Sequence, residues 1–457
     1  MSDEQRSGAW ADERADLQPT GHGAAADTLV GVDGEFTISA PGEWQNLPDA
    51  VEDDLMVINM GPQHPSTHGV LRMLLTMDGE IIVDNQPVIG YLHTGIEKNA
   101  EYRPWVQGVT FVTRMDYLSP LFNELAYCLA VEKLLGITEE IPERAQALRV
   151  ILTEINRITS HQVALATAGM ELGALSAMIY GFRDREDLLD ILEFVTGLRM
   201  NHAFIRPGGL VQDVPTDFVA RTSQVIDALP AKIDELEDLL THNPIWLERN
   251  TGVGLLTAEQ CLDLGVTGPV LRSAGVAHDL RKSQPYCGIE QYDFNVPTTD
   301  TADSYGRFLI RVQEMRESIR IVQQALRSLP SGPVMVADKK IAWPAQLALG
   351  PDGLGNAQSY IGKIMGQSME ALIHHFKLVT EGFSVPAGQV YQAVESPRGE
   401  LGYHVTSDGG NKPYRLRVRD PSFIHIGTIP TLTRGLLIAD VIAAVASLDP
   451  VMGGVDR

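Results

Sequence analysis

Residues 70–77 alternate in polarity, with the most apolar side chains at the odd-numbered positions. A period of two predicts a β-strand with one buried face. The next two residues, Asp78 and Gly79, form a dipeptide typical of two-residue hairpin turns, and a second apolar run follows at 80–83. We therefore predict a β-hairpin in this part of the chain.

The segment before this hairpin, residues 59–69, places His64 and His68 among prolines and glycines. Proline lacks the backbone N–H and restricts φ, while glycine adopts conformations closed to other residues, so this composition opposes a helix through both histidines. We predict a stiff loop that carries both imidazoles and joins two strands of a small antiparallel sheet.

From Ser119 onward the apolar residues recur at helical spacing, which predicts helices over 119–136, with Pro120 near the start, and over 142–169. The same periodicity predicts further helices, at 184–204, 216–242, 303–328, 357–381 and 435–447. Strand-like alternation returns at 395–419, where we expect it to extend a sheet. The predicted fold class is therefore α+β, with a small N-terminal antiparallel sheet, a central helical bundle and an irregular C-terminal part with additional strands.

These patterns divide the chain into four predicted parts: an acidic arm at 1–50, a β-rich domain with the histidine loop at 51–118, a helical bundle core at 119–390, and C-terminal strands, helix and packed tail at 391–457. The first 55 residues hold 13 acidic and 2 basic residues. We expect the first ~30 residues to be disordered, because they offer few apolar groups to offset the entropy of ordering. They match neither a secretory signal nor a transit peptide.

The formal net charge of −23 repels phosphates, which excludes nucleic acid as a partner and disfavours adhesion to anionic lipid. The apolar stretch at 435–448 is too short to cross a bilayer. Only three cysteines occur, far apart and without CxxC spacing, so we expect neither a disulfide framework nor a thiolate metal site. No metal ligand set is predicted.

The HxxxH spacing of His64 and His68 raises the question of a zinc protease site. That site needs both histidines on one helical face and a glutamate after the first, where this chain has Pro65. Two interpretations stay open for the histidines. They either bind backbone carbonyls within a tight loop or serve as a rigidly mounted proton donor, because imidazole changes charge near neutrality.

Three more side chains combine useful chemistry with an informative position. Tyr117 lies just before a predicted helix, where its phenol could donate a proton to a carbonyl, or it is simply a half-buried tyrosine. Arg114 beside it is typical of a surface or ion-pair residue. Glu171 lies among small apolar residues, where an uncompensated charge is costly, so we expect it to have a partner.

Five motifs occur in a characteristic order: GPQHPSTHG at 61–69, YLHTGIEK at 91–98, RMDY at 114–117, RPGG at 206–209 and VDR at 455–457. In these motifs the chain, from about residue 50 onward, resembles the D-subunit family of bacterial respiratory complex I, the NADH-quinone oxidoreductases. The resemblance implies a fold like that of the [NiFe]-hydrogenase large subunit. It also implies a role in forming the cavity where quinone is reduced, coupled to proton pumping by the membrane arm.

The resemblance assigns roles by position. His68 and Tyr117 would be the catalytic pair that hydrogen-bonds the quinone and supplies protons. Glu171, where the family commonly has an aspartate paired with that histidine, and Val451 would complete the quinone site. The remaining assignments are Arg114 and His202 near the neighbouring iron-sulfur cluster, with Gly61, His64 and Gly69 as loop support. Thr94 and Asn201 depart from family patterns of arginine and histidine.

The same resemblance implies that this chain alone binds no cofactor, that quinone is its substrate, and that the iron-sulfur clusters and FMN belong to partner subunits. The implied partners are those of complex I: the small cluster-bearing B subunit, the C subunit and the membrane protein that forms the quinone channel, with NADH acting through the whole complex. The implied location is peripheral, on the cytoplasmic side of the cell membrane.

Two alternatives differ in kind from a quinone-site subunit. A hydrogenase would hold nickel with two CxxC pairs, but Asp116, Ser119, Val451 and Gly454 occupy the four cysteine positions. Without soft thiolate ligands a nickel-iron centre has nothing to bind. The other alternative is a non-catalytic scaffold that only docks a cluster-bearing partner.

Overall fold

The computed structural model describes residues 31–32, 35–36, 55–345, 362, 366 and 369–457. The chain divides into two units, Met1–Leu55 and Met56–Arg457. In the first unit, β1 (Gly31–Val32) pairs with β2 (Glu35–Phe36) in antiparallel fashion. The predicted disorder of the first residues lies outside the described part of the chain. Everything below concerns the second unit, whose finer division at residues 118 and 390 stays a prediction.

The N-terminal sheet has the strand order β3-β4-β5 and contains β3 (Leu55–Met60), β4 (Arg72–Asp78) and β5 (Ile81–Val88). The buried side chains of β4 are Met73, Leu75 and Met77, so the predicted alternation is confirmed. The hairpin is also confirmed, but its loop is one residue later than predicted. Asp78 still pairs with Ile81, which leaves Gly79 and Glu80 to turn the chain, and Gly79 adopts a positive φ of 59°.

The long helices of the bundle are α4 (Pro120–Leu135), α5 (Glu143–Glu171), α6 (Leu175–Thr196), α7 (Phe218–Leu240) and α12 (Ser304–Arg327). Four of them confirm the predicted ranges to within a few residues. The prediction of a helix at 184–204 is wrong at both ends. The helix begins at Leu175 and stops at Thr196, because Gly197 takes a left-handed conformation that caps the C-terminus.

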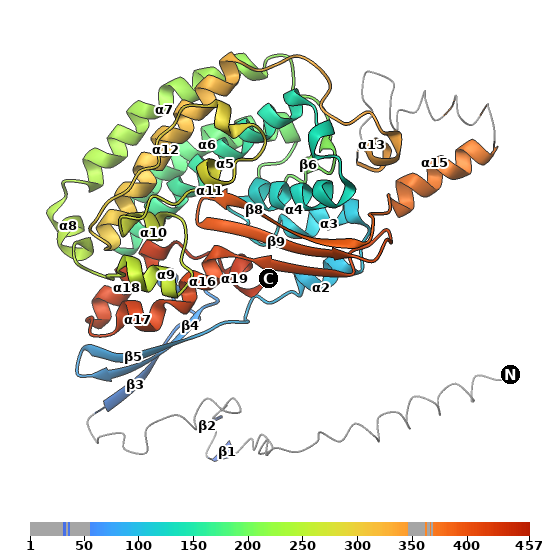
Figure 1. Cartoon of the computed structure of the whole chain (residues 1–457). Helices are drawn as coiled ribbons and strands as arrows, with labels where there is room; N and C mark the ends of the chain where they lie inside the picture. Colours follow the sequence, from blue (N-terminus) through green and yellow to red (C-terminus); the bar gives the residue numbers. More distant parts are fainter. Residues whose placement is uncertain (1–30, 33–34, 37–54, 346–361, 363–365, 367–368) are drawn as a thin grey trace, which may run out of the picture. The chain divides into compact units, whose positions relative to one another are not determined.

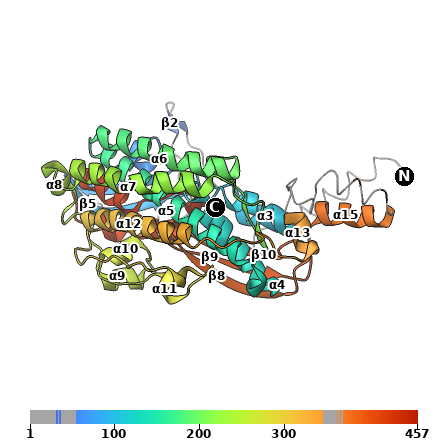
Figure 2. The same ribbon diagram turned by 90° about the horizontal axis from the view of Figure 1, so that it is seen from above.

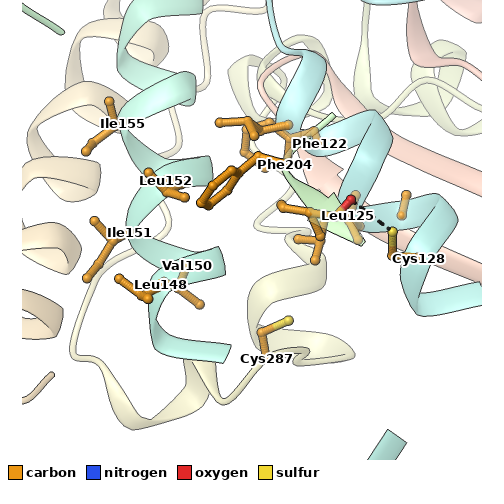
Figure 3. Close-up of a cluster of buried hydrophobic side chains, with 14 of the residues drawn as sticks. Phe122, Leu125, Cys128, Leu148, Val150, Ile151, Leu152, Ile155, Phe204 and Cys287 are labelled. Carbon is orange, nitrogen blue, oxygen red and sulfur yellow. Dashed lines mark hydrogen bonds between the residues drawn. The ribbon is translucent and has the colours of Figure 1, made fainter. Parts of the chain in front are cut away.

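Both ribbon views place α6, α7 and α12 side by side, with α5 packed against α6 and α12 (Figures 1 and 2). On its other side α5 meets α4, and Figure 3 shows Leu152, Phe204 and Leu125 between the two helices. Residues 120–132 of α4 are all buried, because β8 and β9 also pack against this helix. A helix enclosed on every side is mostly apolar, and its buried charges, such as Glu132, need partners.

A second sheet has the order β10-β9-β8 and consists of β8 (Gly388–Ser396), β9 (Gly399–Ser407) and β10 (Arg415–Arg419). The predicted strand character of residues 395–419 is confirmed, because this segment supplies β9, β10 and the end of β8 to one sheet. The segment supplies its own partners, because Ser396 pairs with Gly399 across a tight turn at Pro397 and Arg398. The mixture of helices and small antiparallel sheets confirms the α+β class.

The predicted helix at 435–447 is confirmed as α18 (Ile438–Leu448). Of the helix predicted at 357–381, the structure shows α15 (Met369–Glu381), and the earlier part falls almost wholly outside the described residues. The shorter elements are η2 (Pro65–Thr67), α2 (Ile96–Glu101), α3 (Trp105–Val112), η3 (Thr138–Glu140), β6 (Ile205–Arg206), β7 (Gly209–Leu210), α8 (Pro244–Asn250), α9 (Ala258–Asp263), α10 (Pro269–Ser273), α11 (Leu280–Ser283), η4 (Ile289–Gln291), α13 (Lys339–Ala345), α16 (Pro421–Gly427), α17 (Ile429–Thr433) and α19 (Met452–Asp456). Within the described residues no helix is both long and apolar enough to cross a bilayer.

The bundle core contains completely buried ion pairs. Arg149 on α5 binds Glu132 on α4 through both carboxylate oxygens, at 3.1 and 2.5 Å, and donates to the carbonyl oxygens of Arg206 and Gly209 at 3.0 Å. Both side chains of the pair are fully buried. The pair therefore ties α5 and α4 to the β6–β7 turn, and neither charge can be removed alone without leaving the other unpaired.

Replacing Arg149 with methionine should lower the free energy of unfolding by about 3–5 kcal/mol, because Glu132 would stay buried without its cation. Urea unfolding of the full-length chain measures this loss. Arg320→Met is the matched control, since its partner Asp293 is exposed, and it should cost about 1 kcal/mol or less. Equal losses in the two variants would contradict the assigned importance of the buried pair.

Candidate functional site

The histidine loop between β3 and β4 is held by its own hydrogen bonds. The Nδ1 atom of His64 accepts from the Ser66 N–H at 3.2 Å, which caps the η2 turn. Thr67 is buried, and its Oγ1 lies 3.0 Å from the Pro62 carbonyl oxygen. Gly61 has a φ of +84°, and a Cβ there would lie 2.3 Å from the Leu71 carbonyl oxygen. Backbone packing at this glycine therefore fixes where the loop begins and ends.

His68 ends the η2 turn in a left-handed conformation, with φ of 54°, and keeps an exposed face. The protein around it lowers the pKa of its imidazole, mainly through desolvation. Asp449 raises that pKa and Arg398 lowers it, so both charges act on His68. The ring is thus held near two groups that come from the C-terminal part of the chain.

Tyr117 lies in the short turn that leads into α4, as predicted. The preceding residue, Asp116, organises this turn: its Oδ1 accepts from the backbone N–H groups of Leu118 at 3.2 Å and Ser119 at 3.1 Å, and its Oδ2 accepts from the Ser119 hydroxyl. Burial raises the pKa of the Tyr117 phenol, and Asp116 adds to the rise. Tyr117 therefore holds its proton at neutral pH.

A fully buried guanidinium joins these segments. The Nη1 atom of Arg398 donates to Asp116 Oδ2 and to the Ser160 hydroxyl, both at 2.9 Å. Its Nε donates to the Asp449 carbonyl oxygen at 2.9 Å, and its Nη2 lies 3.1 Å from the Asp449 carboxylate. We call Asp116, Arg398 and Asp449 the buried charge cluster. Its charges influence the pKa values of both His68 and Tyr117.

The C-terminal tail packs against the Tyr117 turn. A Cβ on Gly453 would lie 2.2 Å from the Met115 carbonyl oxygen and 3.2 Å from the Tyr117 ring. Val451 is 1% exposed, and its N–H points to the Ser422 hydroxyl at 3.3 Å. The expectation of a packed tail is confirmed. Val451 lies in the protein interior, and its contact with quinone stays a prediction.

Asp420 is a further buried carboxyl group beside the cluster. It caps α16 by accepting from the Ser422 N–H at 2.8 Å. Burial raises its pKa to about 6, and the nearby Asp116 adds to this, while Arg398 and Arg457 oppose it. A side chain on Gly454 would collide with Asp420, since a Cβ there would lie 2.3 Å from Oδ2.

Glu171, the last residue of α5, lies in partly buried surroundings. Burial alone raises the pKa of its carboxyl group to about 7. Its Oε2 is buried without a hydrogen-bond partner in the described structure. No hydrogen bond joins Glu171 to His68 among the described residues, so the pairing implied for these two side chains stays a prediction.

Arg114 and His202, which the resemblance places near the iron-sulfur cluster of a neighbouring subunit, differ in exposure. Arg114 is exposed, and its guanidinium contacts the Thr110 carbonyl oxygen and lies 3.4 Å from the Thr113 hydroxyl. His202 is buried, and this burial lowers its pKa to about 4. A neutral imidazole therefore stands at position 202, whereas Arg114 presents a permanent positive charge at the surface.

A cavity of about 740 Å³ lies between residues 58–64 and the α18 side chains Ile438, Ala439 and Ile442. It borders the His64 side of the loop, and its lining includes neither His68 nor Tyr117. In the described part of the chain, no group of three or more histidine, cysteine or acidic side chains could hold a metal ion.

Sequence reasoning identified His68, Tyr117 and Asp116 but did not assign a role to Arg398, Asp449 or Asp420. A lone arginine in a hairpin turn is normally exposed, and nothing local to residue 398 predicts burial. The only signal was its position between Pro397 and Gly399, where the chain turns tightly. The partners of Arg398 lie hundreds of residues away or in the tail, so only folding reveals them.

The fold and the site define an α+β protein in which a histidine and a tyrosine lie beside one buried charge cluster. Residues 171–457 match the family described as respiratory-chain NADH dehydrogenase, 49 kDa subunit. The chain is 62% identical to the D subunit of NADH-quinone oxidoreductase from Nocardia farcinica, over 94% of each chain. It is 65% identical to the D subunit from Mycolicibacterium smegmatis, over 88% of this chain and 91% of that one. The identity to the D 1 subunit from Streptomyces avermitilis is 62%, over 96% and 100%.

These matches confirm the family inferred from the motifs. The chain belongs to the family of the NADH-quinone oxidoreductase D subunit, which is the 49 kDa subunit family of the respiratory-chain NADH dehydrogenase.

Glu171→Gln should make the stability of the full-length chain less dependent on pH. The raised pKa means that the wild-type chain bears a penalty for ionising Glu171, absent below its ordinary pKa of 4.5 and fully present above about 7. The wild type and the variant should therefore unfold at similar temperatures at about pH 5, with the variant more stable at about pH 8. Scanning calorimetry measures the difference. Glu259→Gln, at an exposed position, should show no such divergence; a constant offset for Glu171→Gln would refute the assigned pKa.

Proposed function

We propose that this chain is the quinone-site subunit of a proton-translocating NADH-quinone oxidoreductase, and that His68 and Tyr117 serve its chemistry. The observation that carries the proposal is that Arg398 binds both Asp116, the residue before Tyr117, and Asp449, whose charge acts on His68. Family membership supplies the reaction, and the site supplies groups suited to it.

Reduction of a quinone to a quinol takes up two electrons and two protons. The electrons would come from an iron-sulfur cluster of the neighbouring B subunit. Tyr117 keeps its proton at neutral pH because burial raises its pKa, so it can hydrogen-bond a quinone oxygen and donate as negative charge develops there. His68, on a rigid loop with an exposed face, is suited to supply the second proton and to regain it from solvent. Glu171 would be a proton-holding carboxyl group near neutrality.

The exposed Arg114 would stand near the partner's cluster, where a fixed positive charge favours the reduced state. The C subunit and the membrane protein that forms the quinone channel would be further partners, with FMN and the other clusters also in partner subunits. The chain would be held peripherally on the cytoplasmic side of the cell membrane through this assembly.

We further propose a common fold with the [NiFe]-hydrogenase large subunit, without its metal chemistry. Asp116 and Ser119 stand at one pair of ligand positions, and Val451 and Gly454 at the other. The three cysteines of the chain are buried elsewhere, and burial raises the pKa of each thiol, to about 11 for Cys287. These thiols are therefore poor ligands, which favours a quinone site over a nickel centre.

Tyr117→Phe and His68→Ala should each lower quinone reduction by at least about tenfold, because each removes a proton donor. The assay is NADH-driven reduction of a soluble quinone by the purified complex. Electron transfer from NADH to ferricyanide, which does not need the quinone site, should stay at the wild-type level and reports correct assembly.

The matched controls are Tyr414→Phe and His242→Ala, which alter exposed side chains, and both should keep full activity. Wild-type quinone reduction in both Tyr117→Phe and His68→Ala, in assembled complexes, would refute the proposed roles. Quinone photo-crosslinks that fall entirely on other subunits would favour a scaffold function instead.

A further inference from the structure

Arg398 occupies an unusual place for an arginine in a hairpin turn. It lies between β8 and β9 and is 1% exposed. Its backbone is as constrained as its side chain, because a Cβ on Gly268 would lie 2.3 Å from the Arg398 carbonyl oxygen. The turn is thus pressed against the 267–268 backbone, and the guanidinium has one direction in which to extend.

The guanidinium binds three segments that are distant from one another in the sequence. Asp116 belongs to the turn that carries Tyr117, Ser160 lies within α5, and Asp449 directly follows α18. Four contacts of 2.9 to 3.1 Å distribute over Nε, Nη1 and Nη2. Such a planar arrangement of donors is specific to arginine, since a lysine ammonium cannot span it.

The cluster also places charge beside the two proposed proton donors. Asp449 and Arg398 both act on His68, while Asp116, Arg398 and Asp449 all act on Tyr117. Arg398 lowers the pKa of each donor, and the carboxylates oppose it. Asp420 is the remaining carboxyl group that faces Arg398. Three carboxyl groups, those of Asp116, Asp449 and Asp420, and the Tyr117 phenol therefore act on one guanidinium.

Another buried arginine, Arg149, differs from Arg398 in the groups that it contacts. Arg149 is equally buried and equally well paired, but its partners are Glu132 and the β6–β7 turn. Neither His68 nor Tyr117 is influenced by Arg149. If buried ion pairs served stability alone, substitution of either arginine would have the same kind of effect. Only Arg398 is linked to His68 and Tyr117, so only its substitution should alter the site directly.

We infer that Arg398 is a positioning residue for quinone reduction, which holds the Tyr117 turn and the Asp449 segment in the arrangement that presents Tyr117 and His68 to one substrate. The inference rests on the proposed function of this chain. Arg398 touches no substrate itself and acts through Asp116 and Asp449.

The test uses Arg398→Lys and Arg398→Gln in the purified complex, with Arg149→Lys as the matched buried control. Arg398→Lys should lower kcat for quinone reduction about tenfold or more, because a small displacement of an aligned group costs that much. Arg149→Lys should keep the wild-type kcat in whatever fraction assembles. Activities are expressed per unit of NADH-ferricyanide activity, which counts assembled complex and so separates loss of folding from loss of positioning.

The pH dependence of quinone reduction provides a second measurement, which a purely structural role of Arg398 would leave unchanged. Quinone reduction falls as pH rises through the pKa of a proton donor. Removal of a nearby positive charge raises that pKa, so the high-pH limb should shift upward in Arg398→Gln and stay in place in Arg398→Lys. A wild-type kcat in Arg398→Lys together with an unshifted limb in Arg398→Gln would overturn the inference.

The outcomes separate the two proposals. If Tyr117→Phe and His68→Ala lose quinone reduction while both Arg398 variants keep wild-type kcat and pH profile, the proposed function stands and the positioning role is wrong. If Tyr117→Phe and His68→Ala are fully active, the proposed function itself fails, whatever the Arg398 variants show.

Discussion

Pairing of the buried Arg398 guanidinium with Asp116 and Asp449 is the constraint on which the site depends. A charge in a low-dielectric interior is costly unless excellent geometry compensates it, so each partner requires the others. Because the three residues belong to a hairpin turn, a helix entry and the tail, their pairing places those segments together. The position of Tyr117 follows from this arrangement, since it is the next residue after Asp116.

Around this cluster the structure gathers groups whose proton affinities differ. Tyr117 holds its proton firmly, His68 releases its own readily, and burial raises the pKa of Asp420 to about 6. The physical cause is the same in each case: desolvation disfavours the charged form, which raises the pKa of an acid and lowers that of an imidazole. In the proposed function these groups would serve a substrate that takes up protons as it is reduced, with His68 regaining its proton from solvent. His68 is exposed, while the packed tail keeps Tyr117 half-buried.

The glycines of the tail show how closely these pieces fit. Gly453 and Gly454 leave no room for a Cβ against Met115 and Asp420, so the tail can approach both the Tyr117 turn and α16. Larger residues at these positions would push the tail away from the cluster. Close backbone approach joins the regions proposed to correspond to the two halves of a hydrogenase centre.

The sequence by itself determined the local elements and the family. Period-two and helical patterns predicted β4, the hairpin and most long helices, because burial of one face selects a matching spacing of apolar residues. The proline- and glycine-rich motif identified the loop that carries His68. The apolar pattern misplaced both ends of α6, whose C-terminus is set by the cap at Gly197. The burial of Arg398 could be decided only by the tertiary structure, because its partners, Asp116, Ser160 and Asp449, are distant in sequence and a buried charge is tolerated only where all of them meet.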